Sequence, residues 1–310
     1  MISTERFRQY GEMSMRERTD RMPKLTAMNH PFQISMALLV ITCIFLTGCG
    51  RGIASSMRRT SANNGDYGVL IGVAEDRIIP QAEGYRIIVV EGQELSTETI
   101  RQLQDNGHQV YSYLNIGSLE TYRDYYDQFA YAVLDEYDNW PDEYWIDATA
   151  PEWREYIVDT VGKALADKKV DGFFLDNADV YYQYHHDGIY DGLVSILEGL
   201  QKYHLKTIIN GGDAFVSRLL DGGNTELIDG INQECVFSTI EDYSGNIFGA
   251  QEKEDLLYFA DYLDMVRTAG IEVYLLEYTT DKKLIERIRT FCKAHGYLYY
   301  ISDSTALDGE

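Results

Sequence analysis

The sequence predicts an α/β protein built as a (β/α)8 TIM barrel, and three observations support this fold class. Eight short apolar runs alternate with segments of helical periodicity from residue 67 onward. The runs are nearly continuous in Val, Ile, Leu, Phe and Tyr, as strands covered on both faces must be. They occupy about 240 residues, close to the ~250 typical of such barrels. A doubly wound open sheet is the alternative, but no glycine-rich phosphate-binding turn follows the first run.

Residues 1–48 are predicted to be a lipoprotein signal peptide. An apolar run from Ile34 to Leu46 follows Lys24 and leads into Leu-Thr-Gly-Cys, with the cysteine at position 49. A run this short behind a basic segment is typical of secretory signals, whereas a membrane span needs about 20 apolar residues. The end of the run resembles the lipobox of bacterial lipoproteins, which implies cleavage before Cys49 and a lipid on its thiol. An uncleaved anchor helix is the alternative.

The segment 49–66 is polar and rich in small residues, so we expect a flexible lipidated tether between the membrane and a barrel at 67–310. These features predict an extracytoplasmic protein anchored to the bacterial cell membrane through its lipid. Only Cys235 and Cys292 remain in the barrel, too few for a disulfide framework.

The predicted strands share a high content of β-branched and aromatic residues and begin at Tyr67, Arg86, Gln109, Asp171, Lys206, Ile228, Glu272 and Tyr297. Capping residues indicate the helices between them. Ser96 is the expected N-cap of a helix that stops at Gly107, and Pro151 lies in the first turn of another. A later helix ends at Gly296 and places Cys292 on its apolar face. Because the sequence stops soon after the last strand, the eighth helix is expected to be short or missing.

Carboxylates and amides end nearly every predicted strand. They are Glu91, Asn115, Asp176, Asn177, Asn210, Glu234, Glu277 and Asp303. Active sites of (β/α)8 barrels lie where the strands end and the following loops begin. Turns and caps alone would not require so many polar residues there, so the sequence predicts one polar mouth.

Charge and missing motifs narrow the chemistry of this mouth. The chain has 27 basic and 50 acidic residues and a formal charge of −23, which argues against a nucleic-acid partner. No lysine ends a predicted strand, which disfavours a Schiff-base enzyme. The adjacent His185 and His186 lie in a tyrosine-rich loop without a second ligand pair, so we expect neither a metal nor a cofactor.

The loop after the third predicted strand is long and crowded with Tyr and Trp. Such a loop is usually functional or disordered, and this one is too aromatic for disorder. Some of its rings are expected to pack on the barrel. Flat rings beside carboxylates suit a sugar, whose C–H faces stack while its hydroxyls form hydrogen bonds. Glycoside hydrolysis needs two carboxyl groups, and Asp176 and Glu234 are the two best placed.

The chain resembles the endo-α-1,4-polygalactosaminidase family, glycoside hydrolase family 114, and its uncharacterised bacterial relatives. The matching stretches are VYSYLNIGSLETYR, YWIDATAPEW, VDGFFLDNADVY, IINGG and NQECVF, which occur in the order that the family shows. The resemblance implies that Asp176 is the nucleophile and Glu234 the general acid/base of a retaining mechanism, with Asp179 as the reserve catalyst. The chain departs from the pattern at Ser118, where many members have Glu, so that only Glu120 supplies an acid there.

A predicted substrate-binding set surrounds this pair and consists of Glu91, Tyr113, Asn115, Glu120, Trp145, Asp147, Asn177, Asp179, Asn210, Tyr243, Glu277 and Asp303. Because no Lys or Arg ends a strand, we expect an electronegative mouth that favours a polysaccharide bearing free amines. Two other hypotheses stay open at this point. One is a non-catalytic carbohydrate-binding lipoprotein on the same barrel, and the other is a metal-assisted deacetylase.

Overall fold

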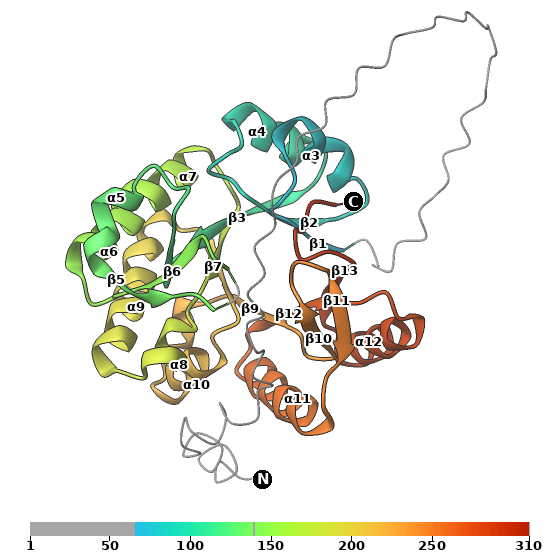
Figure 1. Ribbon diagram of the computed structural model, residues 1–310. Coiled ribbons are helices and arrows are strands. Elements are labelled where there is room, and N and C mark those ends of the chain that lie inside the picture. The colour runs from blue at the N-terminus through green and yellow to red at the C-terminus, as the bar shows by residue number, and fades with distance from the viewer. Residues whose placement is uncertain (1–65, 139, 310) are drawn as a thin grey trace, which may run out of the picture. The chain divides into compact units, whose positions relative to one another are not determined.

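Eight parallel strands form the central sheet and follow one another around it in chain order (Figure 1). They are β1 (Tyr67–Leu70), β2 (Ile87–Val90), β3 (Gln109–Asn115), β7 (Gly172–Asp176), β8 (Lys206–Asn210), β9 (Gly230–Glu234), β12 (Glu272–Tyr278) and β13 (Leu298–Ser302). β13 lies beside β1, so the sheet closes almost completely. The computed structural model describes residues 66–138 and 140–309. It confirms the predicted barrel and all eight strands, while the predicted signal peptide and Cys49 lie outside the described residues.

Helices pack around the outside of the barrel. They are α3 (Glu75–Ala82), α4 (Thr97–Asp105), α6 (Pro151–Tyr156), η2 (Ile157–Gly162), α7 (Lys163–Asp167), α8 (Val180–Tyr184), α9 (Asp187–Leu200), η3 (Gln201–Tyr203), α10 (Asp213–Asp221), η4 (Thr225–Leu227), α11 (Lys253–Thr268) and α12 (Lys282–His295). Residues 303–309 form no helix after β13, which agrees with the expectation for the eighth helix. Within the described residues, no helix is both long and apolar enough to cross a bilayer.

The predicted helix ends agree with the structure. Ser96 caps α4 by accepting a hydrogen bond from the backbone N–H of Thr99 at 3.1 Å. Pro151 is the first residue of α6, where its missing N–H has no intrahelical partner to lose. Cys292 is fully buried on α12, and Gly296 ends that helix with a φ of +72°, a left-handed conformation that glycine adopts without strain.

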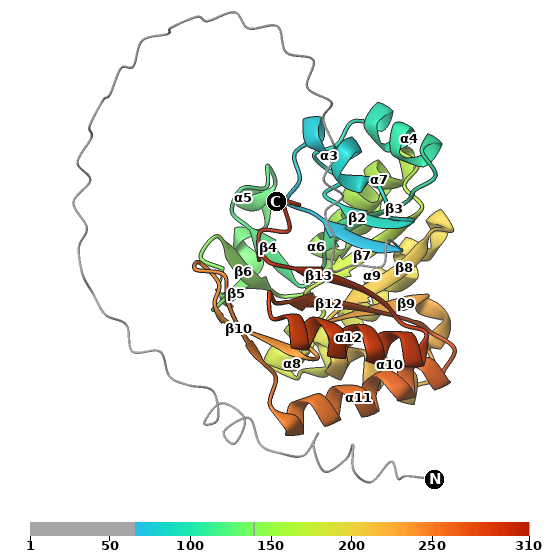
Figure 2. The same ribbon diagram turned by 90° about the vertical axis from the view of Figure 1, so that its right-hand side faces the viewer.

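Two insertions stand at the end of the barrel where the strands point, as Figure 2 shows. The connection after β3 contains β4 (Ser118–Glu120), α5 (Tyr126–Phe129), η1 (Ala130–Ala132), β5 (Val133–Glu136) and β6 (Glu143–Ile146). Its three strands form an antiparallel sheet in the order β4-β6-β5. The connection after β9 contains the hairpin β10 (Ser238–Asp242) and β11 (Ile247–Ala250). The long aromatic loop therefore forms a small antiparallel sheet next to the mouth of the barrel.

Candidate active site

Three consecutive strands of the barrel end in side chains that meet at the mouth. Asp176 ends β7, Asn210 ends β8 and Glu234 ends β9. The Nδ2 of Asn210 donates to Asp176 Oδ1 at 2.9 Å and to Glu234 Oε1 at 2.7 Å. The two carboxylate oxygens are therefore no more than 5.6 Å apart, the sum of these two bonds. This limit agrees with the ≈ 5–5.5 Å between the carboxyl groups of retaining glycosidases.

A buried chain of hydrogen bonds fixes the bridging amide. Asn232 Nδ2 donates to Asn210 Oδ1 at 2.6 Å, and the hydroxyl of Tyr67 donates to Asn232 Oδ1 at 3.0 Å. Tyr67 and Asn232 are fully buried inside the barrel. Because a hydroxyl starts the chain as donor, each amide has one orientation in which every bond pairs a donor with an acceptor. In that orientation the NH₂ group of Asn210 points at both carboxylates.

The backbone turns sharply directly after each carboxylate residue. Asn177 has a φ of +64° and Cys235 a φ of +55°. Asparagine visits this left-handed region more readily than most residues, whereas at a cysteine it costs about 1–3 kcal/mol. The backbone N–H of Cys235 donates to the carbonyl of Leu276 at 3.0 Å, which helps to hold the second turn.

Glu277 stabilises the segment after this second turn through hydrogen bonds to its backbone. Its carboxylate accepts from the backbone N–H groups of Val236, Phe237 and Ser238 at 2.9–3.1 Å, and from Ser238 Oγ at 2.6 Å. Glu277 is fully buried and does not line the pocket. Its predicted place among the substrate-binding residues is therefore corrected: it fixes the segment that follows Glu234. The side chain of Glu277 points away from the pocket, because side chains alternate along a strand and those of its neighbours Leu276 and Tyr278 line the pocket.

Burial sets the protonation of the two carboxylates. It raises the pKa of Glu234 to about 7, and the negative charge of Asp176 adds to this effect. Burial also raises the pKa of Asp176, but hydrogen bonds from Asn210, the Asn177 backbone and Tyr113 oppose the rise. The donors around Asp176 therefore favour its ionised form, while a pKa of about 7 leaves a substantial fraction of Glu234 protonated near neutral pH. Two carboxyl groups with separated pKa values are the arrangement that acid/base assignments require.

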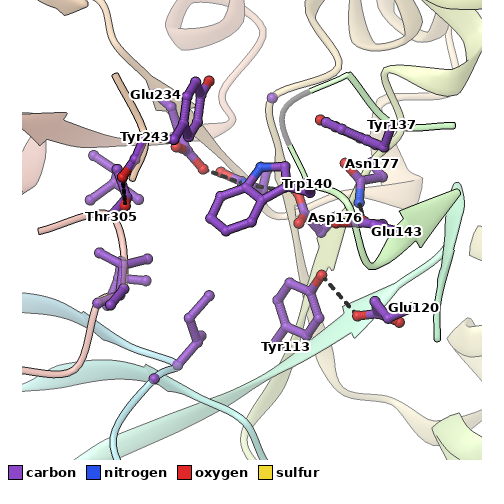
Figure 3. Close-up of a pocket in the computed structure, with 18 of the residues that line it drawn as sticks. Tyr113, Glu120, Tyr137, Trp140, Glu143, Asp176, Asn177, Glu234, Tyr243 and Thr305 are labelled. Carbon is purple, nitrogen blue, oxygen red and sulfur yellow. Dashed lines mark hydrogen bonds between the residues drawn. The ribbon is translucent and has the colours of Figure 1, made fainter. Parts of the chain in front are cut away.

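A pocket of about 640 Å³ opens above the pair (Figure 3). Besides the strand ends, its walls come from the β5–β6 connection, the β10–β11 hairpin and residues 305–307. Trp140 and Tyr243 meet edge to face with ring centroids 5.6 Å apart, and the hydroxyl of Thr305 donates to the carbonyl of Tyr243 at 3.1 Å. Aromatic faces and carboxylates thus surround one cavity.

Seven residues of the predicted substrate-binding set line this pocket, namely Glu91, Tyr113, Glu120, Asn177, Asp179, Asn210 and Tyr243. Besides Glu277, four others lie outside its lining. Asn115 is buried beneath it and binds Ser118 and Glu143. Trp145 stacks under Tyr137 with centroids 4.2 Å apart. Asp147 accepts from the backbone N–H of Thr149, and Asp303 is exposed beyond β13.

The mouth contains a cation that the strand-end pattern does not reveal. Arg123 is only 6% exposed, and its Nη2 lies 2.8 Å from Glu91 Oε2 and 3.0 Å from Glu120 Oε1. These two acids are therefore paired with a cation from the insertion after β3, although no Lys or Arg ends a strand of the barrel. Arg123 itself does not line the pocket, and the described lining residues include no Arg, Lys or His. Asp176, Asp179, Glu143 and Glu234 leave the cavity acidic.

Sequence reasoning missed several pocket residues, of which Glu143, Tyr137, Trp140 and Tyr278 matter most. The hydroxyl of Tyr278 donates to Glu234 Oε2 at 2.9 Å. Glu143 has its pKa raised to about 7, chiefly by burial. It lies on a strand of four residues inside the aromatic loop, where no strand-end pattern marks it. Within the part of the chain that the structure describes, no cluster of three His, Cys, Asp or Glu side chains could hold a metal ion.

A (β/α)8 barrel that carries a close carboxylate pair at its mouth has the architecture of a glycoside hydrolase. The chain belongs to glycoside-hydrolase family GH114, whose sequence model matches residues 55–309, and it is a glycoside hydrolase. This match confirms the predicted family.

Individual proteins match the chain more distantly. It is 23% identical over 164 residues to an uncharacterized protein of Thermotoga maritima, a match that spans 49% of this chain and 50% of that protein. Its fold is similar to the glycoside hydrolase domain of PelA from Pseudomonas aeruginosa, with 19% identity, coverage of 78% and 96% of the two chains and a TM-score of 0.67. It is also similar to Ega3 from Aspergillus fumigatus, solved in complex with galactosamine, with 15% identity, coverage of 83% and 98% and a TM-score of 0.63. At these identities the solved structures establish a shared fold.

Proposed function

We propose that this protein hydrolyses glycosidic bonds of a galactosamine-containing polysaccharide with retention at the anomeric carbon. Asp176 is the nucleophile and Glu234 the general acid/base. The observation that carries this proposal is the single amide nitrogen of Asn210, which hydrogen-bonds to both carboxylates. Family membership and the galactosamine bound to Ega3 support the choice of sugar.

The first step forms a covalent glycosyl-enzyme. A carboxylate oxygen of Asp176 bonds to the anomeric carbon, the bond from that carbon to the bridging oxygen breaks, and Glu234 gives its proton to the departing oxygen. In the second step a water attacks the same carbon, Glu234 takes a proton from the water, and Asp176 leaves as a carboxylate. Each turnover therefore returns both side chains to their starting protonation states.

The charge of Asp176 helps Glu234 to change roles between the two steps. In the resting site the negative charge of Asp176 raises the pKa of Glu234, so that Glu234 starts as an acid. The ester formed in the first step removes that charge. The pKa of Glu234 then falls, and the side chain becomes a carboxylate that can accept a proton. The amide of Asn210 neither supplies nor takes a proton, and it can donate hydrogen bonds to Asp176 and Glu234 in both steps.

The acidic pocket predicts a preference for polymers with free amines. We expect new reducing ends to appear faster from a deacetylated α-1,4-galactosaminide polymer than from its fully acetylated form. The rate on the deacetylated polymer should fall by roughly tenfold as salt rises well past 0.1 M, where charges are screened over ~10 Å. Both polymers are assayed with the wild type at several salt concentrations, with Asp176→Asn as the blank. Equal rates on the two polymers, with no effect of salt, would contradict the preference.

We also propose that the barrel is held at the outer face of the cell membrane by a lipid on Cys49. The support is the apolar run that leads into Leu-Thr-Gly-Cys. Cys49→Ser expressed in the native host is expected to leave the protein unprocessed or to release it from the membrane fraction, as fractionation and intact mass would show. The matched control is Cys43→Ser, which changes a cysteine inside the same apolar run. A Cys49→Ser protein of mature mass that stays in the membrane fraction would refute the anchor.

A further inference from the structure

Glu143 is a third carboxylate at the nucleophile, and its two oxygens have different surroundings. Oε1 accepts from Asn177 Nδ2 at 2.7 Å, from Asn115 Nδ2 at 2.9 Å and from the hydroxyl of Ser118. Among the described residues, no group donates a hydrogen bond to Oε2. The side chain lines the pocket. Its orientation is thus fixed through one oxygen while the other keeps its capacity to accept.

The position of Glu143 is set by the residue next to the nucleophile. Two amides flank Asp176: Asn210 connects it to Glu234, and Asn177 connects the following turn to Glu143. Figure 3 shows Asp176 with Glu234 on one side and with Asn177 and Glu143 on the other. When the anomeric carbon is at Asp176 and the departing oxygen at Glu234, Glu143 lies on the side of one of the two ring atoms bonded to the anomeric carbon, the ring oxygen or C2. The ring oxygen has no proton to donate to a carboxylate, so the acceptor Oε2 suits the C2 side. In galactosamine that carbon, C2, carries the amine.

The other acids of the mouth fit an amine less well. Glu91 and Glu120 share the guanidinium of Arg123. Asp179 accepts from the backbone N–H of Gly212 at 3.0 Å, on the turn after β8, and the charge of Asp213 acts on it. No Lys, Arg or His among the described lining residues lies near Glu143 to neutralise it.

We propose that Glu143 receives the C2 ammonium group of the substrate and so selects galactosamine over N-acetylgalactosamine. This assignment rests on the proposed function. An ammonium donates charge-assisted hydrogen bonds to a carboxylate, which are roughly twice as strong as neutral ones. An acetamide offers one neutral N–H and adds a bulky acyl group, so it gains much less from the same oxygen.

The electrostatics around Glu143 agree with a cationic ligand. Burial raises the pKa of Glu143 to about 7, the charges of Asp176 and Glu120 add to the rise, and Tyr113 and Tyr137 also face it. Donors from Ser118 and Asn115 oppose the rise. A bound ammonium favours the ionised form and offsets the cost of burying this charge.

The test compares kcat/KM for galactosamine and N-acetylgalactosamine oligomers of equal length and linkage. Glu143→Gln keeps the shape of the side chain and removes its charge. We expect the ratio of the two kcat/KM values to shift by roughly 10- to 100-fold against the free amine. Glu143→Asp keeps the charge and is expected to retain the larger part of the preference. The matched control is Glu136→Gln, an exposed residue on the neighbouring strand β5, which should leave the ratio unchanged.

Asp179→Asn separates the proposal from a general effect of negative charge. It is expected to lower both rates and to preserve their ratio. Equal losses on both oligomers in Glu143→Gln would overturn the assignment and leave Glu143 as a support for Asn115 and Asn177. A ratio that collapses in Asp179→Asn but not in Glu143→Gln would also overturn it. Both of these results leave the proposed function standing, whereas a wild type that cleaves neither oligomer would overturn that function and this assignment together.

Discussion

Asp176→Asn is expected to lower turnover by on the order of 10⁴-fold or more while the barrel and its oligosaccharide binding persist. The asparagine has nearly the same shape, and its carbonyl oxygen can still accept from Asn210, so the packing at the end of β7 is retained. Its amide is a far weaker nucleophile than a carboxylate, so the covalent step fails.

The Asp176→Asn prediction is checked by kcat on a galactosaminide oligomer, oligomer affinity by calorimetry, and circular dichroism. Asp167→Asn is the matched control, since Asp167 is an exposed residue of α7 paired with Lys163. It should behave as the wild type does. Full activity in Asp176→Asn would rule out its role as the nucleophile.

Glu234→Gln is expected to discriminate between leaving groups. Loss of the acid should cost roughly 10²- to 10⁴-fold in kcat/KM on the natural polymer, whose departing oxygen needs a proton. An aryl galactosaminide with an activated leaving group departs without that proton, so formation of the glycosyl-enzyme should be largely spared. Burst kinetics on the aryl substrate measure this first step separately from the second.

The pH profile of kcat/KM gives a second readout for the same variant. Glu234 acts as an acid only while protonated, and its pKa is raised to about 7, so wild-type activity should fall as the pH rises past that value. Asp176 must be ionised, so activity should also fall on the acidic side. In Glu234→Gln the alkaline limb should disappear and the acidic limb should remain. Equal losses of kcat/KM on the polymer and on the aryl galactosaminide, with an unchanged alkaline limb, would mean that a group other than Glu234 protonates the departing oxygen.

The barrel itself was predictable because its strands are buried on both faces and therefore read as continuous apolar runs. The same reasoning predicted that strand ends converge, which brought Asp176, Asn210 and Glu234 into one site hypothesis. It could not tell which side each end residue faces. Glu277 shows this limit, since the neighbouring Tyr278 lines the pocket in its place. One residue of register reverses the direction of a side chain.

Features inside the loops were harder to predict for two physical reasons. The strands β4, β5, β6, β10 and β11 have only three to five residues each, too few for a periodic pattern to emerge. The pairing of Arg123 with Glu91 joins residues 32 positions apart and depends on the fold alone. Glu143 combines both difficulties, because its partners lie on either side of the insertion: Asn115 ends β3 and Asn177 follows β7.

The anomeric configuration of the first product tests the central claim most directly. An α-1,4-galactosaminide oligomer is hydrolysed in an NMR tube, and proton spectra are recorded before the new reducing ends mutarotate. Two displacements at one carbon, first by Asp176 and then by water, predict that the α-anomer appears first and converts slowly to the equilibrium mixture. Initial release of the β-anomer would mean a single displacement by water, and it would contradict the retaining mechanism and the role of Asp176.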